Sequence, residues 1–83
     1  MGTKEKLIER FSKQPKDFTW DELVRLFAVF GFRMSNKGRT SGSRVIFIKE
    51  NMAYVAHKPH PGNIVKSYVI RQVFDFLSEL GYI

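Results

Sequence analysis

Residues 42–62 read GSRVIFIKENMAYVAHKPHPG, and the rest of the chain is predicted to pack around them. Residues 44–48 predict a strand, because four of the five are β-branched or aromatic. Glu50 and Asn51 then form a polar break that favours a tight turn, since Asn tolerates a positive φ. Residues 52–56 return as the antiparallel partner. The stretch therefore predicts a β-hairpin, followed by a stiff exit that contains two prolines.

The first strand of this hairpin carries apolar side chains on both faces. Because successive side chains of a strand point to opposite faces, Val45 and Phe47 share one face. Arg44, Ile46 and Ile48 share the other. Periodicity alone therefore leaves open which face meets solvent.

The chain before the hairpin predicts helices. Residues 4–12 have a narrow apolar stripe, and a helix this short persists only if it docks on other elements. Pro15 breaks it, since proline cannot continue a helix that has formed. We expect residues 1–17 to be an accessory helix and linker, and residues 18–83 to form the main domain.

The main domain is expected to open with a second helix. Thr19 and Glu22 match a capping box, in which hydroxyl and carboxylate satisfy backbone donors of the first turn. Gly31 ends that helix, and the alternating residues 32–35 predict a first strand.

After the hairpin, the apolar pattern predicts a helix over residues 64–80, capped by Asn63 and stopped by Gly81. The predicted order is helix, helix, three strands, helix. The simplest solution is an α+β fold, in which a three-stranded antiparallel sheet has helices packed on one face.

The net charge of +6 is concentrated in the middle of the chain. Residues 31–74 hold eight Lys or Arg and one acid, whereas residues 1–30 hold six bases and five acids. Such an excess attracts polyanions, and nucleic acid is the commonest polyanion inside a cell. A solubilising surface charge is the alternative interpretation.

Several classes of protein are disfavoured by what the chain lacks. Without Cys, neither a disulfide framework nor a Cys-based zinc site can form, which fits a reducing cytoplasm. No apolar run approaches the roughly 20 residues that span a bilayer. The basic loop at residues 36–42 matches neither GxxxxGK[ST] nor GxGxxG. We therefore expect a cytoplasmic protein without a cofactor.

His57 and His60 are the only imidazoles in the chain. Imidazole exchanges protons near neutral pH, so both are candidate catalytic residues, and a structural role in the loop is the alternative. A metal site is not expected, because Pro59 holds the histidines apart and no Cys or nearby acid completes a coordination set.

Basic side chains at the ends of the sheet are candidates for holding a phosphate backbone. They are Arg33, Lys37, Arg39, Arg44, Lys58 and Lys66, with Ser43 as a further donor to phosphate.

Two motifs carry a resemblance to a known family. Gly42-Ser43-Arg44-Val45 opens the strong strand, and His60-Pro61-Gly62-Asn63 precedes the final helix. In this order, over residues 18–82, they resemble the HicA toxins of bacterial toxin–antitoxin pairs. The resemblance implies an αβββα fold like that of double-stranded-RNA-binding domains. It also implies a small endoribonuclease that cleaves mRNA (an mRNA interferase), and a HicB-like antitoxin that covers its active face.

The chain departs from the family at one position. HicA toxins typically read Gly-Ser-x-His with a catalytic histidine, and here that position is Val45, which cannot move a proton. Either hydrolysis has been lost, or another imidazole has taken over. For the second case we expect His57 as the base, with Arg44, Lys58 and His60 holding phosphate and charge.

Three functions therefore stay open. The leading hypothesis is an RNA-binding HicA-like toxin that is also a candidate mRNA endoribonuclease. The alternatives are a non-catalytic module that binds double-stranded RNA or DNA, and a protein-interaction domain that binds an acidic HicB-like partner.

Overall fold

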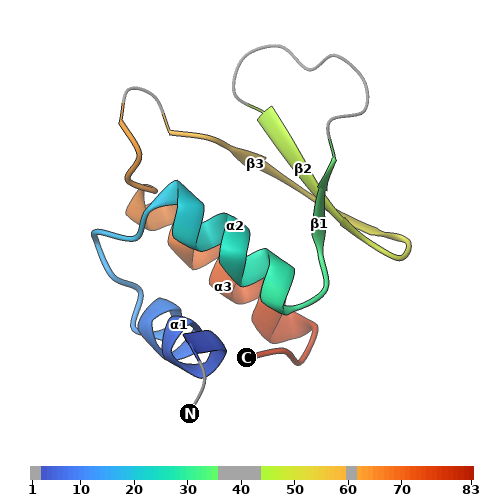
Figure 1. Cartoon of the computed structure of the whole chain (residues 1–83), viewed down its shortest axis with the longest axis horizontal. Coiled ribbons are helices and arrows are strands. Elements are labelled where there is room, and N and C mark those ends of the chain that lie inside the picture. Colours follow the sequence, from blue (N-terminus) through green and yellow to red (C-terminus); the bar gives the residue numbers. More distant parts are fainter. Residues whose placement is uncertain (1–2, 36–43, 60–61) are drawn as a thin grey trace.

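The computed structural model describes residues 3–35, 44–59 and 62–83 (Figure 1). Its elements are α1 (Thr3–Ser12), α2 (Trp20–Val29), β1 (Arg33–Ser35), β2 (Arg44–Lys49), β3 (Met52–His57) and α3 (Ser67–Glu79). The three strands form one antiparallel sheet in the order β1-β2-β3. The predicted α+β class and order of elements are confirmed. No helix in these ranges is long and apolar enough to cross a membrane.

The helices form two layers on one side of the sheet (Figure 1). α2 and α3 run side by side against the sheet, and α1 packs on the side of α2 and α3 that faces away from it. Phe11 of α1 is fully buried, and its ring lies 5.4 Å from that of Phe18 and 6.2 Å from that of Phe74. The short first helix is therefore docked, as its length requires.

The register of the hairpin decides which face of β2 is buried. Phe47 lies opposite Tyr54, and Val45 lies opposite Ala56, on the face that packs against the helices. Phe47 and Ala56 are almost completely buried. Val55 is 49% exposed, so the opposite face is the one that meets solvent.

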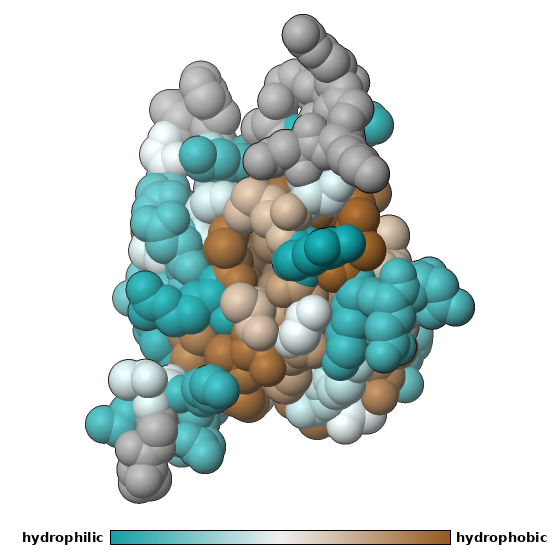
Figure 2. Space-filling model, turned by 45° about the vertical axis from the view of Figure 1, so that its right-hand side comes forward, coloured by the Kyte–Doolittle hydropathy of each residue, from teal (hydrophilic) through white to brown (hydrophobic). Residues whose placement is uncertain are grey.

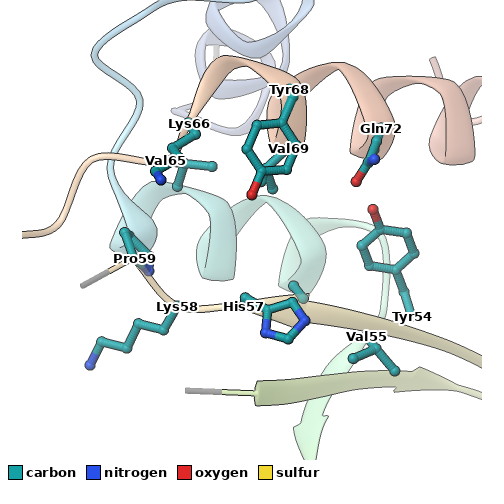
Figure 3. Close-up of a pocket in the computed structure, with 11 residues that line it drawn as sticks. Tyr54, Val55, His57, Lys58, Pro59, Val65, Lys66, Tyr68, Val69 and Gln72 are labelled. Atoms are coloured by element: carbon teal, nitrogen blue, oxygen red, sulfur yellow. The ribbon is translucent and has the colours of Figure 1, made fainter. Parts of the chain in front are cut away.

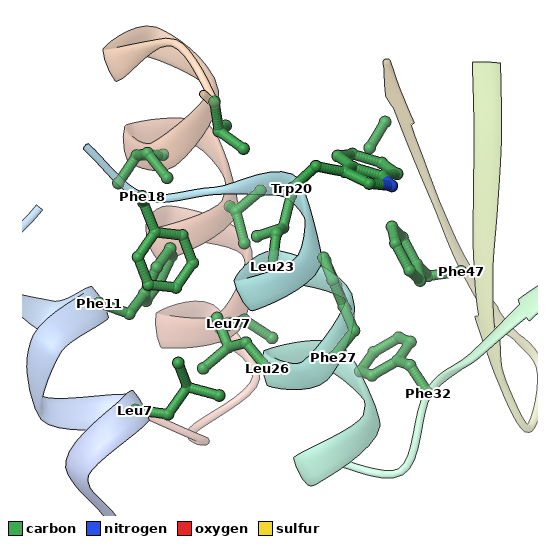
Figure 4. Close-up of a cluster of buried hydrophobic side chains, with 14 residues drawn as sticks. Leu7, Phe11, Phe18, Trp20, Leu23, Leu26, Phe27, Phe32, Phe47 and Leu77 are labelled. Carbon is green, nitrogen blue, oxygen red and sulfur yellow. The ribbon is translucent and has the colours of Figure 1, made fainter. Parts of the chain in front are cut away.

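An aromatic cluster joins the helix layer to the sheet (Figure 4). The ring of Phe27 in α2 stacks on Phe47 in β2, with centroids 4.2 Å apart and planes 10° apart. The ring centroids of Trp20 and Phe47 are 5.9 Å apart. Tyr54 of β3 lies 4.6 Å from Phe76 of α3. These aromatic side chains supply much of the apolar surface that is buried in the core, and their contacts hold the sheet against α2 and α3.

Glu22 links the start of α2 to α1. The predicted capping box is present: the Thr19 amide donates to Glu22 Oε1 at 2.9 Å, and the Glu22 amide donates to Thr19 Oγ1 at 3.2 Å. Arg10 of α1 also donates from Nε to Glu22 Oε2 at 2.9 Å. One carboxylate therefore caps α2 and holds α1 against it.

The segment before α3 differs from the prediction. The backbone of residues 63–65 pairs with that of residues 18–20, through Trp20 N to Asn63 O and Val65 N to Phe18 O, both at 2.8 Å. Because this pairing keeps the backbone extended, α3 begins at Ser67, and its N-cap is Lys66 instead of Asn63. The helix predicted over residues 64–80 is therefore shorter at its start.

Lys49 has a structural role. Its ammonium donates to the carbonyl oxygen of Phe30 at 2.7 Å and to the Tyr82 hydroxyl, and lies 4.3 Å from the centre of the Tyr82 ring. Gly31 follows with a φ of +93°, and a Cβ there would meet Lys49 Cε at 3.3 Å. This lysine of the basic middle region therefore ties β2 to the end of α2 and to the C-terminal residues.

Replacement of Glu22 by Gln is expected to reduce the acid sensitivity of folding. Hydrogen bonding by Arg10 is the largest cause that lowers the pKa of Glu22 from its ordinary value of 4.5. The ionised group therefore stabilises the fold above pH 4.5, and that contribution is lost as the pH falls through the lower pKa of the folded state. Urea unfolding between pH 7 and about 3 should show a smaller loss of unfolding free energy in Glu22→Gln than in the wild type. Glu79→Gln, at the end of α3, is the control, and an equal loss in Glu22→Gln and wild type would contradict this role.

Replacement of Phe27 by Ala is expected to cost about 3–5 kcal/mol of unfolding free energy. The side chain is fully buried and contacts the rings of Phe32, just before β1, of Phe47 in β2 and of Tyr54 in β3, so its removal leaves a cavity between the helices and the sheet. Met34→Ala, on the edge strand at 39% exposure, should change the unfolding free energy by about 0.5 kcal/mol or less. Equal effects of the two substitutions in chemical denaturation would refute the importance of this cluster.

Candidate functional site

A cluster of polar side chains lies where β2 begins and β3 ends. Arg44 and His57 are directly opposite in the register, so both project from the face that points away from the helices. Lys58 follows His57 in the chain, and all three residues are exposed. We call Arg44, His57 and Lys58 the basic corner.

A pocket of about 230 Å³ lies beside this corner, between β3 and the first turns of α3 (Figure 3). Ala56, Val65 and Val69 give it apolar walls. Tyr54 reaches into it from β3, and Tyr68 and Gln72 reach into it from α3 (Figure 3). We call it the β3–α3 pocket.

The charge around the β3–α3 pocket is positive. Lys58 and Lys66 line it from its two sides, and none of the described residues that line it is acidic. Lys66 is the N-cap of α3, whose first turn contains no acid, so the positive end of the helix dipole adds to these two cations. This region therefore favours an anionic ligand.

Tyr54 joins the wall of the pocket to the aromatic core. Its ring packs between Phe27, at 5.7 Å, and Phe76, at 4.6 Å. Burial raises the pKa of Tyr54 above its ordinary value of 10.0. The hydroxyl therefore stays protonated at neutral pH and can donate a hydrogen bond.

The predicted site residues are not all brought together. Arg33 pairs with Ile48, four residues along β2 from Arg44, which is about 13 Å at the rise of a strand. Arg33 therefore lies at the opposite end of the sheet from the basic corner. The remaining predicted residues, Lys37, Arg39, Ser43 and His60, lie outside the described residues.

Val45 and His57 lie on opposite faces of the sheet. Val45 is partly buried against the core and pairs with Ala56, whereas His57 is the next residue along β3 and projects outward. Residue 45, where the resemblance expects a histidine, therefore lies close to His57 along the paired strands β2 and β3. They do not share an environment, so His57 cannot occupy the place of a side chain at residue 45.

Outside the corner, the surface is mixed in character. Figure 2 shows a face on which apolar side chains gather in the centre around a hydrophilic side chain, with further hydrophilic side chains on its flanks. Within the described ranges, no three His, Cys, Asp or Glu side chains are grouped so that they could hold a metal ion. The geometry therefore concentrates the candidate site at the basic corner and the pocket beside it.

The sequence-based prediction missed the two tyrosines and the glutamine of the pocket. Tyr54 is part of the hairpin. The alternation of side chains along a strand indicates which face Tyr54 lies on, but it cannot indicate that a cavity lies beside it. Tyr68 gives a weak signal, because it is a large aromatic residue that is 61% exposed while Ile70, Val73 and Leu77 of the same helix are buried. An aromatic residue off the apolar stripe of a helix is the pattern that could have indicated it.

Comparison with known proteins assigns the family. The family model described as HicA toxin of bacterial toxin-antitoxin matches residues 20–81, from the start of α2 to the turn after α3. No curated protein and no solved structure gave a significant match. The match covers most of the chain and agrees with the αβββα arrangement of α2, the sheet and α3. The chain therefore belongs to the HicA toxin family, the toxin half of a bacterial toxin–antitoxin pair.

Proposed function

We propose that this toxin binds mRNA in the cytoplasm and cleaves it at the basic corner. The observation that carries the proposal is the cross-strand pair of Arg44 and His57, which sets a cation beside an imidazole on the open face of the sheet. Lys58 and Lys66 extend the positive charge toward α3. A phosphodiester placed here has a proton acceptor and counter-charges within one small region.

The chemistry that suits this pair is attack by the ribose 2′-hydroxyl. His57 accepts the 2′-hydroxyl proton as the 2′-oxygen bonds to phosphorus, and the bond from phosphorus to the 5′-oxygen breaks. The leaving oxygen takes a proton from solvent, so the products are a 2′,3′-cyclic phosphate and a 5′-hydroxyl. Arg44 stabilises the charge that develops on the phosphoryl oxygens, since its guanidinium donates to two oxygens at once.

Val45 favours a second candidate function. Because no proton carrier stands at that position, a toxin that binds RNA without cutting it is consistent with the same basic corner. In either case we propose a HicB-like antitoxin as the partner, with acidic groups that cover the corner.

The first test is cleavage of a labelled single-stranded RNA by the purified chain, resolved on a denaturing gel. His57→Ala and Arg44→Ala are each expected to lower the cleavage rate, His57→Ala by about 100-fold or more, because a general base is lost. Arg33→Ala, at the other end of the sheet, is the matched control and should retain most of the rate. The exposure of all three residues means that thermal unfolding should be little changed.

Each outcome separates the hypotheses. Cleavage that survives His57→Ala would exclude His57 as the base, and His60→Ala then tests the other imidazole. If no variant and no wild-type sample cleaves while RNA is bound, the binding function is supported. If the wild type neither binds nor cleaves RNA, the proposal is wrong.

The second test is the salt dependence of RNA binding. Lys58→Ala and Lys66→Ala should each weaken binding and lower the slope of log K against log salt by about 0.7, as expected for one lost phosphate contact on a single strand. Lys4→Ala, an exposed lysine of α1, should leave the slope unchanged. Equal slopes for all three variants would show that the charge near the pocket does not contact phosphate.

A further inference from the structure

The cleavage chemistry does not occupy the interior of the β3–α3 pocket, although His57 and Lys58 are among the residues that line it. Arg44 and His57 project from the open face of the sheet, whereas Tyr54 reaches into the pocket from the other side of β3 (Figure 3). At about 230 Å³ the pocket is smaller than the roughly 300–1,000 Å³ of sites for drug-sized ligands. It therefore suits a single planar group and is too small for a folded partner or a helix.

The walls and the polar groups of the pocket match the surface of a nucleobase. Val65 and Val69 offer apolar contact, and Tyr68 adds an aromatic ring. At one end, Tyr54 and Gln72 point toward one another across the opening (Figure 3). The amide of Gln72 offers both donors and an acceptor, and the Tyr54 hydroxyl adds a donor, as a base edge requires.

Tyr68 exposes a large aromatic ring to solvent at the edge of the pocket. It is 61% exposed although it is a large aromatic side chain, so its ring contributes little to the core. A second hollow lies on its other side, lined by Lys16 and Arg71 among others. The ring thus stands between two regions that contain cations, an arrangement typical of platforms on which single-stranded nucleic acid stacks a base.

We propose that the β3–α3 pocket binds one unpaired nucleobase of the RNA, stacked on Tyr68 and hydrogen-bonded by Gln72 and Tyr54. The inference rests on the proposed function and names its substrate class. Since bases of an A-form duplex are paired and stacked inside the helix, only an unpaired base can enter, and the substrate is single-stranded at this point. The adjoining phosphates then lie against Lys66 and Lys58, and Arg44 and His57 of the basic corner come next along the strand.

The experiment measures binding by fluorescence anisotropy with 2′-O-methyl oligonucleotides, which cannot be cleaved because the attacking hydroxyl is blocked. One probe is a labelled single strand, and the other is the same strand in a blunt duplex. Tyr68→Ala should weaken single-strand binding at least about fivefold, whereas Tyr68→Phe, which keeps the ring, should stay close to the wild type. Leu80→Ala, at the far end of α3 and 37% exposed, is the matched control.

Gln72→Ala provides a second, independent measurement. With single strands of uniform A, C, G or U, the variant should lose the preference among bases shown by the wild type, while the salt slope set by the lysines stays the same. A structural role of Gln72 would not produce this split, because it would lower binding to all four strands together.

The outcomes separate this inference from the proposed function. If Tyr68→Ala binds and cleaves single strands as the wild type does, or if the wild type prefers the duplex, the pocket does not hold a base, although RNA cleavage by the basic corner stands. Loss of antitoxin binding without loss of RNA binding in Tyr68→Ala would also overturn the inference. A wild-type chain that binds no RNA at all would refute both.

Discussion

The stacking of Phe27 on Phe47 is the contact on which the rest of the structure depends. It presses α2 against the middle of β2, with ring centroids 4.2 Å apart, and so commits one face of the hairpin to the core. Because side chains alternate along a strand, that commitment sends Arg44 and His57 to the opposite face, where they meet solvent side by side. The position of the candidate site is therefore a consequence of how the core packs.

The basic residues in the middle of the chain do not all have the same role. Lys49 and Lys58 both belong to the basic middle of the chain, yet Lys49 binds a carbonyl at the end of α2 and the Tyr82 hydroxyl, whereas Lys58 is exposed beside the pocket. Part of the positive charge therefore stabilises the fold. For that reason, the number of basic residues in this region is larger than the number proposed to contact RNA. The residues proposed to contact RNA are those that β2, β3 and α3 bring to one end of the sheet.

Helix α1 is joined to the family fold mainly through Glu22 and a few buried rings. The family match begins at residue 20, and α1 packs on the side of α2 and α3 that faces away from the sheet. Its position leaves the basic corner uncovered, which agrees with the proposal that residues 1–17 are an accessory segment. Arg10 secures it with contacts to both Asp17 and Glu22, so a short helix persists that its own length would not stabilise.

Local backbone preferences were enough to predict the capping box at Thr19, the glycine after α2 and the α+β order. They also placed the hairpin turn at Glu50 and Asn51, but the residue with a positive φ is Glu50, at +53°, where Asn51 was expected. The sequence also indicated the family through short motifs. Tertiary packing was needed to show which face of β2 is buried and that Asn63 pairs with Trp20 instead of capping α3. It also separates Arg33 from Arg44 and brings Tyr54, Tyr68 and Gln72 to one pocket. These facts depend on contacts between residues distant in the chain, and apolar residues on both faces of a strand leave such contacts undetermined until the helices pack.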